Sequence, residues 1–247
     1  MNATPAPGIL ALWSLPRARS TVFYRAMLER GDLLALHEPF CNLADYGETD
    51  VAGAVVRSVH ELIAAMRRHA TDRLVFFKDT TDHRYPEMLA DKVFLSQARH
   101  TFLIRRPDEV AVSFLALKPD MAVHEVGLEL MDEIYGAVEH QAQQAPVVID
   151  SDDLVAAPAE TMSAYCAAVG LPFLPESLRW KPSARTEWSR TDRWHQKVNA
   201  STGIVAERSA HPDDAVRDPR VREFARHHEP FYRKLHARRL LVVDRGV

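Results

Sequence analysis

Residues 13–21 have the sequence WSLPRARST and join two stretches of opposite character. The apolar run Ile9–Trp13 that leads into them is typical of a buried strand. The stretch Ser20–Arg30 that follows has the spacing of an amphipathic helix, and Gly31 ends it. A strand, a short basic loop and a helix that begins with two hydroxyl residues therefore follow one another.

This order predicts an anion site at the start of the helix. The free backbone N–H groups of a first helical turn point out of the helix end, and the helix dipole adds partial positive charge. Two arginines and two hydroxyls add donors, which suits a phosphate or sulfate ester. An ordinary turn with a serine cap is the structural alternative. The predicted site residues of this loop are Pro16, Arg17, Ala18, Arg19, Ser20 and Thr21.

The loop is not a Walker phosphate loop. That motif requires Gly-x-x-x-x-Gly-Lys-Ser/Thr. No glycine lies between Gly8 and Gly31, and the chain contains no Gly-Lys pair. An ATP-dependent kinase or GTPase of the usual kind is therefore disfavoured.

A second candidate anion site follows a later apolar run. Thr101–Ile104 has the composition of a buried strand and leads into Arg105. Pro107 suits the first turn of a helix, and Ser113 lies two turns into it. Arg105 at the strand tip and Ser113 on the helix are therefore predicted to hold an anion together.

The alternation of strands and helices predicts an α/β fold with a central parallel sheet. Ligands of such sheets bind beyond the carboxyl ends of the strands. Arg17, Glu38, Lys78 and Arg105 all fall at such ends and should converge on one edge. The predicted strands are Ile9–Trp13, Leu33–Leu36, Leu74–Phe77, Thr101–Ile104 and Val147–Ile149. The predicted helices are Ser20–Arg30, Val51–Ala70, Tyr85–Ala98, Pro107–Leu117 and Val123–Gln144.

The 247 residues suit a single domain, with a core at about residues 8–175 and a lid and C-terminal helical region at about 176–247. Lys181–Ser209 is polar and carries Trp188 and Trp194, which favours a lid over a disordered linker. Asp213–Arg239 is charged, and we expect a helical region broken at Pro219 and Pro230.

The amino-acid composition limits the kinds of binding partner and the cellular compartment that we expect. A net charge of −3 disfavours general nucleic-acid binding. Cys41 and Cys166 have no metal-ligand spacing and indicate a reducing compartment. No metal-binding motif, signal peptide or membrane span is evident, so we expect a cytoplasmic protein with a small-molecule partner. The oligomeric state stays open, a homodimer included.

Three motifs together resemble the sulfotransferase superfamily. Pro16-Arg17-x-x-Ser20-Thr21 resembles its 5′-phosphosulfate loop, and Arg105-x-Pro107-x-x-Val110-x-x-Ser113 resembles its 3′-phosphate motif. Residues 147–154, VVIDSDDL, are similar to its late strand and acidic turn. The likeness is to a bacterial branch whose members carry segments such as HEPF at 37–40, KDTTDH at 78–83 and WHQKVNASTG at 194–203.

The resemblance implies a three-layer fold like that of P-loop NTPases, with a C-terminal lid segment. It also implies transfer of a sulfuryl group from 3′-phosphoadenosine 5′-phosphosulfate to a hydroxyl or amine of a small molecule, with no metal. The chain departs from the pattern in two places. Arg17 stands where the better known enzymes have lysine, and Arg19 replaces a loop glycine, which narrows the allowed backbone.

The resemblance and the residue chemistry assign catalytic roles. Arg17 is expected to stabilise charge on the leaving phosphate. His83 or Glu38 is the candidate general base. Lys78 is expected to approach the sulfuryl group or to pair with a carboxylate. His37 should point away from Glu38 if the strand continues.

The acceptor pocket is the least constrained part of the hypothesis. Phe40, Trp188 and Trp194 are candidates for lining it, although aromatic side chains more often belong to a core. Two other functions stay open. One is a phosphotransferase or nucleotide hydrolase of P-loop-like fold, and the other is a non-catalytic nucleotide-binding relative.

Overall fold

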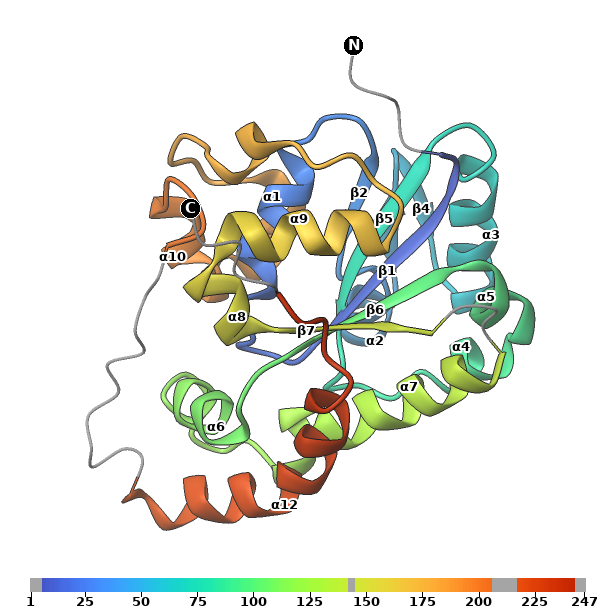
Figure 1. Ribbon diagram of the computed structural model, residues 1–247. Helices are drawn as coiled ribbons and strands as arrows, with labels where there is room; N and C mark the ends of the chain where they lie inside the picture. Colours follow the sequence, from blue (N-terminus) through green and yellow to red (C-terminus); the bar gives the residue numbers. More distant parts are fainter. Residues whose placement is uncertain (1–5, 142–144, 206–216, 243–247) are drawn as a thin grey trace.

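A five-stranded parallel sheet forms the centre of the molecule (Figure 1). The computed structural model describes residues 6–141, 145–205 and 217–242. The strand order is β2-β5-β1-β6-β7, so the strand that carries the basic loop lies in the middle. The predicted parallel sheet is confirmed. The strands are β1 Gly8–Ser14, β2 Leu34–His37, β5 Leu74–Thr80, β6 Arg99–Ile104 and β7 Val147–Asp150.

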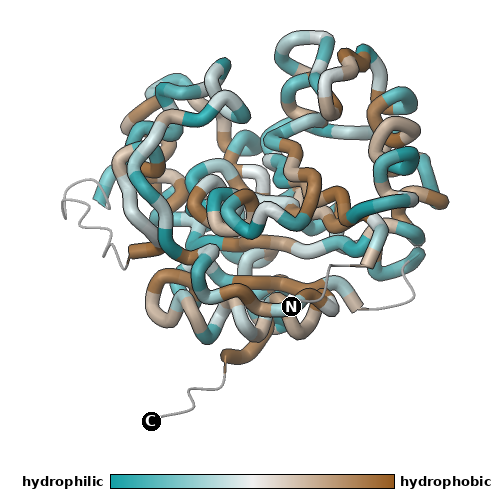
Figure 2. Tube along the Cα trace, turned by 90° about the horizontal axis from the view of Figure 1, so that it is seen from above, coloured by the Kyte–Doolittle hydropathy of each residue, from teal (hydrophilic) through white to brown (hydrophobic). Residues whose placement is uncertain are grey.

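Helices cover both faces of the sheet, which explains the apolar runs in its strands, such as residues 74–77 of β5 and 102–104 of β6. Helices α1 and α9 lie on one face, and α3, α5, α7 and α12 lie on the other (Figure 1). In Figure 2 long hydrophobic stretches run through the middle of the molecule, and the outer coils alternate in hydropathy. None of the helices in the described residues is long and apolar enough to cross a membrane. The larger helices are α1 Ser20–Leu28, α2 Pro39–Tyr46, α3 Val59–His69, α6 Pro107–Leu115, α7 Leu128–Gln141, α9 Pro158–Ala168 and α12 Pro219–His236. The shorter ones are α4 Pro86–Ala90, α5 Lys92–Gln97, η1 Val123–Val126, α8 Ser151–Ala156, η2 Pro175–Leu178, η3 Thr186–Trp194 and α10 Gln196–Ala200.

The predicted helix Val51–Ala70 was wrong in its first part. A small antiparallel hairpin stands there, made of β3 Thr49–Val51 and β4 Ala54–Val56. Its two-residue turn has positive φ angles of 54° at Ala52 and 89° at Gly53, as tight hairpins require. The following helix α3 begins only after Ser58, whose side chain accepts a hydrogen bond from the Glu61 N–H.

Two other predicted helices are interrupted. Tyr85–Ala98 divides into α4 and α5 because Asp91 leaves the helical conformation and caps α5. Val123–Gln144 divides at Gly127, which has a φ of 85°. This glycine lies so close to Thr81 that an added Cβ would fall 2.7 Å from the Thr81 carbonyl oxygen. Residues 142–144 lie outside the described part.

The C-terminal prolines do not break the last helix as expected. Pro219 begins α12, where a missing N–H costs nothing, and Pro230 lies inside it. The helix continues through Pro230 and changes direction along its length (Figure 1). Residues 213–216 of the predicted helical region lie outside the described part.

Helix α2 was not predicted, and a neighbouring strand explains how it begins. Asp79 of β5 is buried and accepts hydrogen bonds from the N–H groups of Phe40, at 2.6 Å, and Cys41, at 3.1 Å. It also accepts from its neighbour Thr80 at 3.0 Å. A carboxylate from another strand thus caps the helix in place of a local side chain.

We predict that Asp79→Ala lowers the free energy of unfolding by at least about 2 kcal/mol, because it leaves buried N–H groups without an acceptor. Asp79→Asn should cost less, since one oxygen remains. Urea denaturation of both variants measures the order. Equal stability of Asp79→Ala and the parent protein would contradict the capping role.

Candidate functional site

A cavity of about 800 Å³ opens where the strands end at their carboxyl edge. Its wall brings together residues from the β1 loop, the ends of β2, β5 and β6, and the segment predicted to be a lid. The predicted site residues in this wall are Pro16, Arg17, Arg19, Ser20, Thr21, Glu38, Lys78, His83, Arg105, Ser113 and Trp194.

Three predicted site residues do not line the cavity wall. Ala18 is fully buried within the loop. Phe40 is 1% exposed and packs in the core, with its ring 5.6 Å from that of Trp13. Trp188 is also 1% exposed, because it anchors the lid segment against Tyr24 and donates a hydrogen bond to Asn199 at 2.9 Å.

The loop after β1 has a backbone conformation that usually demands glycine. Arg17 and Arg19 have φ angles of 62° and 63°, both in the left-handed region. Arg105 holds this conformation by donating from Nη1 to the Arg17 carbonyl oxygen at 2.7 Å. The Arg17 side chain donates to Ser113 Oγ at 3.1 Å and to the Trp194 carbonyl at 3.2 Å. The two predicted anion sites are therefore physically joined.

Positive charge is concentrated at this end of the cavity. Arg19 forms an ion pair with Asp152 at 2.9 Å, and Arg105 pairs with Glu109 at 2.7 Å. Burial and the neighbouring Arg105 lower the pKa of Arg17. Burial and the nearby Arg19 lower the pKa of Arg105, although Glu109 opposes them. Arginine stays protonated in proteins, so these groups form a cationic surface suited to an anion.

The first turn of α1 faces the same cavity. Ser20, Thr21 and Val22 line it, and no side-chain hydrogen bond caps the helix at Arg19. An anion bound at this helix end would meet the N–H groups of the turn, which is the arrangement expected from the sequence.

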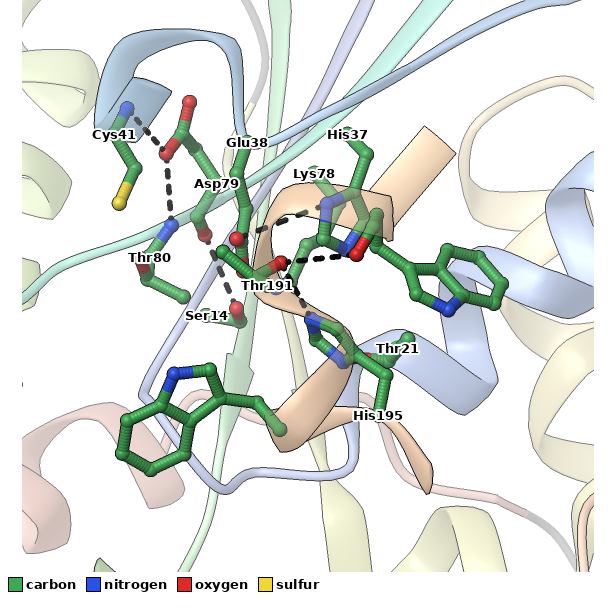
Figure 3. A network of polar contacts seen from close by, with 12 residues as sticks. Ser14, Thr21, His37, Glu38, Cys41, Lys78, Asp79, Thr80, Thr191 and His195 are labelled. Carbon is green, nitrogen blue, oxygen red and sulfur yellow. Dashed lines mark hydrogen bonds and ion pairs between the residues drawn. The ribbon is translucent and has the colours of Figure 1, made fainter. Parts of the chain in front are cut away.

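His195 of the lid segment was missed as a site residue. Its Nδ1 lies 3.0 Å from Thr21 Oγ1, and its Nε2 lies 3.1 Å from Thr191 Oγ1 (Figure 3). Burial and the nearby Lys78 lower the pKa of His195 to about 4, so the ring is neutral at neutral pH. The only signal in the sequence was its place in the segment Trp194–Gly203, which gives no contact partner.

Lys78 and Glu38 form a buried ion pair beside His195 (Figure 3). Burial alone would raise the pKa of Glu38, but Lys78 and its neighbours outweigh it and lower the value to about 2. His37 does not point away from Glu38: the two side chains are 3.7 Å apart, because Glu38 leaves the strand with a φ of 50°. Burial lowers the pKa of His37 to about 3.

His83 follows β5 and Arg105 follows β6, so the two residues lie on opposite sides of β1 in the cavity wall. Its Nε2 is 3.2 Å from Asp45 Oδ1, and its side chain is 36% exposed. Asp45 is also 3.5 Å from the thiol of Cys41. His83 is therefore held by a carboxylate and remains accessible from the cavity.

The fold also gathers two trios of metal-ligand side chains that the sequence did not predict. One is Cys41 with Asp45 and His83, and the other is His37 with Glu38 and His195. A cation in the second trio would face the Lys78 ammonium group bound to Glu38.

Comparisons with known proteins identify relatives. The family described as "Sulfotransferase domain" matches residues 8–239. Two curated Arabidopsis thaliana proteins, branched-chain-amino-acid aminotransferase-like proteins 2 and 1, are 25% and 26% identical over 210 and 212 residues. These matches cover 79% and 80% of this chain but only 36% and 37% of the relatives. The chain thus spans little more than a third of their length.

Two solved structures share the fold. The sulfotransferase domain from the curacin biosynthetic pathway has 15% identity and a TM-score of 0.51, covering 90% of this chain and 98% of that one. A sulfotransferase from Alicyclobacillus acidocaldarius has 11% identity and a TM-score of 0.51, covering 96% and 98%. At these identities the likeness concerns the fold alone.

We predict that Arg19→Gly is more stable than Arg19→Ala by about 1 kcal/mol, because alanine keeps the left-handed strain and glycine removes it. Both variants lose the Asp152 ion pair, so their difference isolates the backbone. Asp152→Asn serves as the control for that pair. Chemical denaturation measures all three, and an alanine variant as stable as the glycine variant would disprove the strained loop.

Proposed function

Because the chain belongs to the sulfotransferase domain family, we propose that it moves a sulfuryl group from 3′-phosphoadenosine 5′-phosphosulfate to a hydroxyl or amine of a small molecule. One observation carries the proposal: two anion sites share a single cavity and are joined by the Arg105 hydrogen bond to the Arg17 carbonyl. A donor with two separate phosphate-bearing positions matches this pair.

The two sites divide the donor between them. Ser20, Thr21 and the N–H groups of the first α1 turn bind the 5′-phosphosulfate. Arg105 and Ser113 bind the 3′-phosphate through charge-assisted hydrogen bonds. The link from Ser113 to the Arg17 side chain, at 3.1 Å, couples the position of one group to that of the other.

Arg17 supplies the main electrostatic contribution to the reaction. The acceptor oxygen or nitrogen forms a bond to sulfur while the bond from sulfur to the phosphate oxygen breaks, and the adenosine bisphosphate leaves with that electron pair. A fixed guanidinium beside the breaking bond stabilises the growing negative charge. Lys78 lies in the same wall and is held by Glu38, so it offers a second cation to the transferring group.

His83 is the better candidate for the base. The acceptor proton must go to a group with adequate proton affinity. Glu38 is a poor choice, because its pairing with Lys78 holds its pKa at about 2. His83 is exposed to the cavity and oriented by Asp45 at 3.2 Å, which resembles the usual pairing of a catalytic imidazole with a carboxylate.

We predict that 3′,5′-adenosine bisphosphate raises the melting temperature more than AMP does, because AMP leaves the Arg105 site empty. Arg105→Ala should remove most of this difference. Differential scanning fluorimetry measures it, with ATP and GTP as further ligands. Equal stabilisation by the bisphosphate and AMP would disprove the second anion site, and preference for ATP would favour a phosphotransferase or hydrolase.

We predict that His83→Ala lowers sulfuryl transfer by about 100- to 10,000-fold, as loss of a general base does, while bisphosphate binding persists. Glu38 as the base would instead leave kcat/KM insensitive to His83→Ala and would place the acidic limb of the profile near its own pKa of about 2. Full activity of His83→Ala with labelled donor excludes the assignment.

A further inference from the structure

Charged side chains of both signs line the cavity. Its arginines come from the β1 loop, the end of β6 and the segment predicted to be a lid, and its lysines include Lys78 of β5 and Lys118 after α6. Three of its carboxylates, Glu38, Asp45 and Asp82, follow β2 and β5, and the fourth, Glu125, belongs to η1. The donor takes the cationic end in the proposed function, so the carboxylates face the acceptor.

Two of these carboxylates already have cations. Glu38 is paired with Lys78, and Glu125 is paired with Lys118. Asp45 is paired with the His83 imidazole, at 3.2 Å, which carries charge only when it is protonated.

Among the residues that the structure describes, no lysine or arginine forms an ion pair with Asp82. Its Oδ1 atom is buried, and none of the donors in the described residues makes a hydrogen bond to it. Asp82 nevertheless belongs to the cavity wall, between Thr80 and His83. A buried, unsatisfied carboxylate oxygen is costly unless a ligand completes it. Burial raises the pKa of Asp82, whereas His83 and a side-chain hydrogen bond from Thr80 to the carboxyl group oppose the rise. A cationic neighbour would therefore favour its ionised form.

We propose that the acceptor carries an ammonium group, which Asp82 and Asp45 bind at the β2–β5 end of the cavity. This inference rests on the proposed function and names the class of its acceptor: an amino alcohol, a phenolic amine or a diamine. The hydroxyl or amine to be sulfated then faces the junction between the two ends, where Lys78 and His83 also line the wall.

An organic cation fits this region better than a metal ion. The trio of Cys41, Asp45 and His83 has metal-ligand chemistry, but a cysteine binds metal as a thiolate. Burial and the surrounding carboxylates raise the pKa of Cys41, so a metal ion at this trio would have to displace a firmly held proton. Asp82, with its unsatisfied oxygen, is not part of that trio.

The test compares acceptors of one shape and different charge. Tyramine, 4-propylphenol and 3-(4-hydroxyphenyl)propionate form one series, and choline with 3,3-dimethylbutan-1-ol forms another. Binding to the bisphosphate-loaded protein is measured by calorimetry, and transfer from labelled donor gives kcat/KM. We expect the cationic member of at least one series to be preferred by about tenfold or more, since charge-assisted contacts are the stronger ones.

Two variants test whether Asp82 causes the preference for a cationic acceptor. Asp82→Asn keeps the shape and removes the charge, and it should bring the cation-to-neutral ratio close to one. Asp50→Asn is the matched control, because Asp50 is exposed on β3 outside the cavity wall, and it should keep the parent ratio. Retained bisphosphate binding shows that Asp82→Asn is folded.

The outcomes separate this inference from the proposed function. If the bisphosphate binds but neutral or anionic members match or exceed the cations in both series, the ammonium assignment is overturned and sulfuryl transfer stands. If the bisphosphate itself does not bind, both fail. Stoichiometric zinc that is lost in Cys41→Ser would also overturn the assignment and give these carboxylates to a metal.

Discussion

The hydrogen bond from Arg105 to the carbonyl oxygen of Arg17 supports the rest of the site. It joins the end of β6 to a loop whose backbone is left-handed at Arg17 and Arg19. Glycine would adopt that conformation without strain, but this chain uses arginine and stabilises it through ion pairs. The loop thus gains two guanidinium groups at the cost of backbone strain, which suits a site that must concentrate positive charge.

Because β1 is the middle strand of the sheet, its loop lies between the ends of the strands on either side. Strands β6 and β7 lie on one side of it, and β2 and β5 lie on the other. Arg105, which follows β6, binds the loop, whereas Glu38, Asp82 and the His83–Asp45 pair follow β2 and β5. The proposed donor and acceptor regions therefore occupy neighbouring parts of one cavity, and Lys78 of β5 belongs to the same wall.

The segment predicted to be a lid contacts both the loop and the start of α1. The Trp194 carbonyl accepts from Arg17, and His195 meets Thr21. Trp188 anchors the segment in the core. Because His195 is neutral and bound on both ring nitrogens, it acts here as a positioning residue for Thr21 rather than as an additional cation.

Local patterns in the sequence determined the central sheet, the basic loop and the two segments predicted to bind anions. Apolar runs identify strands wherever both faces are covered, and a basic loop before Ser20 and Thr21 identifies a helix start. The same patterns gave a wrong prediction at β3–β4, where Gly53 signals a turn within an apolar stretch. They also did not predict α2, because its cap is Asp79 from a different strand.

Only the tertiary structure decided which charged and aromatic side chains contact one another. The fold brings residues together from distant parts of the chain, and three outcomes depend on this. Glu38 becomes the partner of Lys78, Trp188 belongs to the core, and His195 contacts Thr21. Sequence spacing carries no information about such pairs, because burial and Coulomb interactions act through space and change a side chain's proton affinity only once the chain has folded.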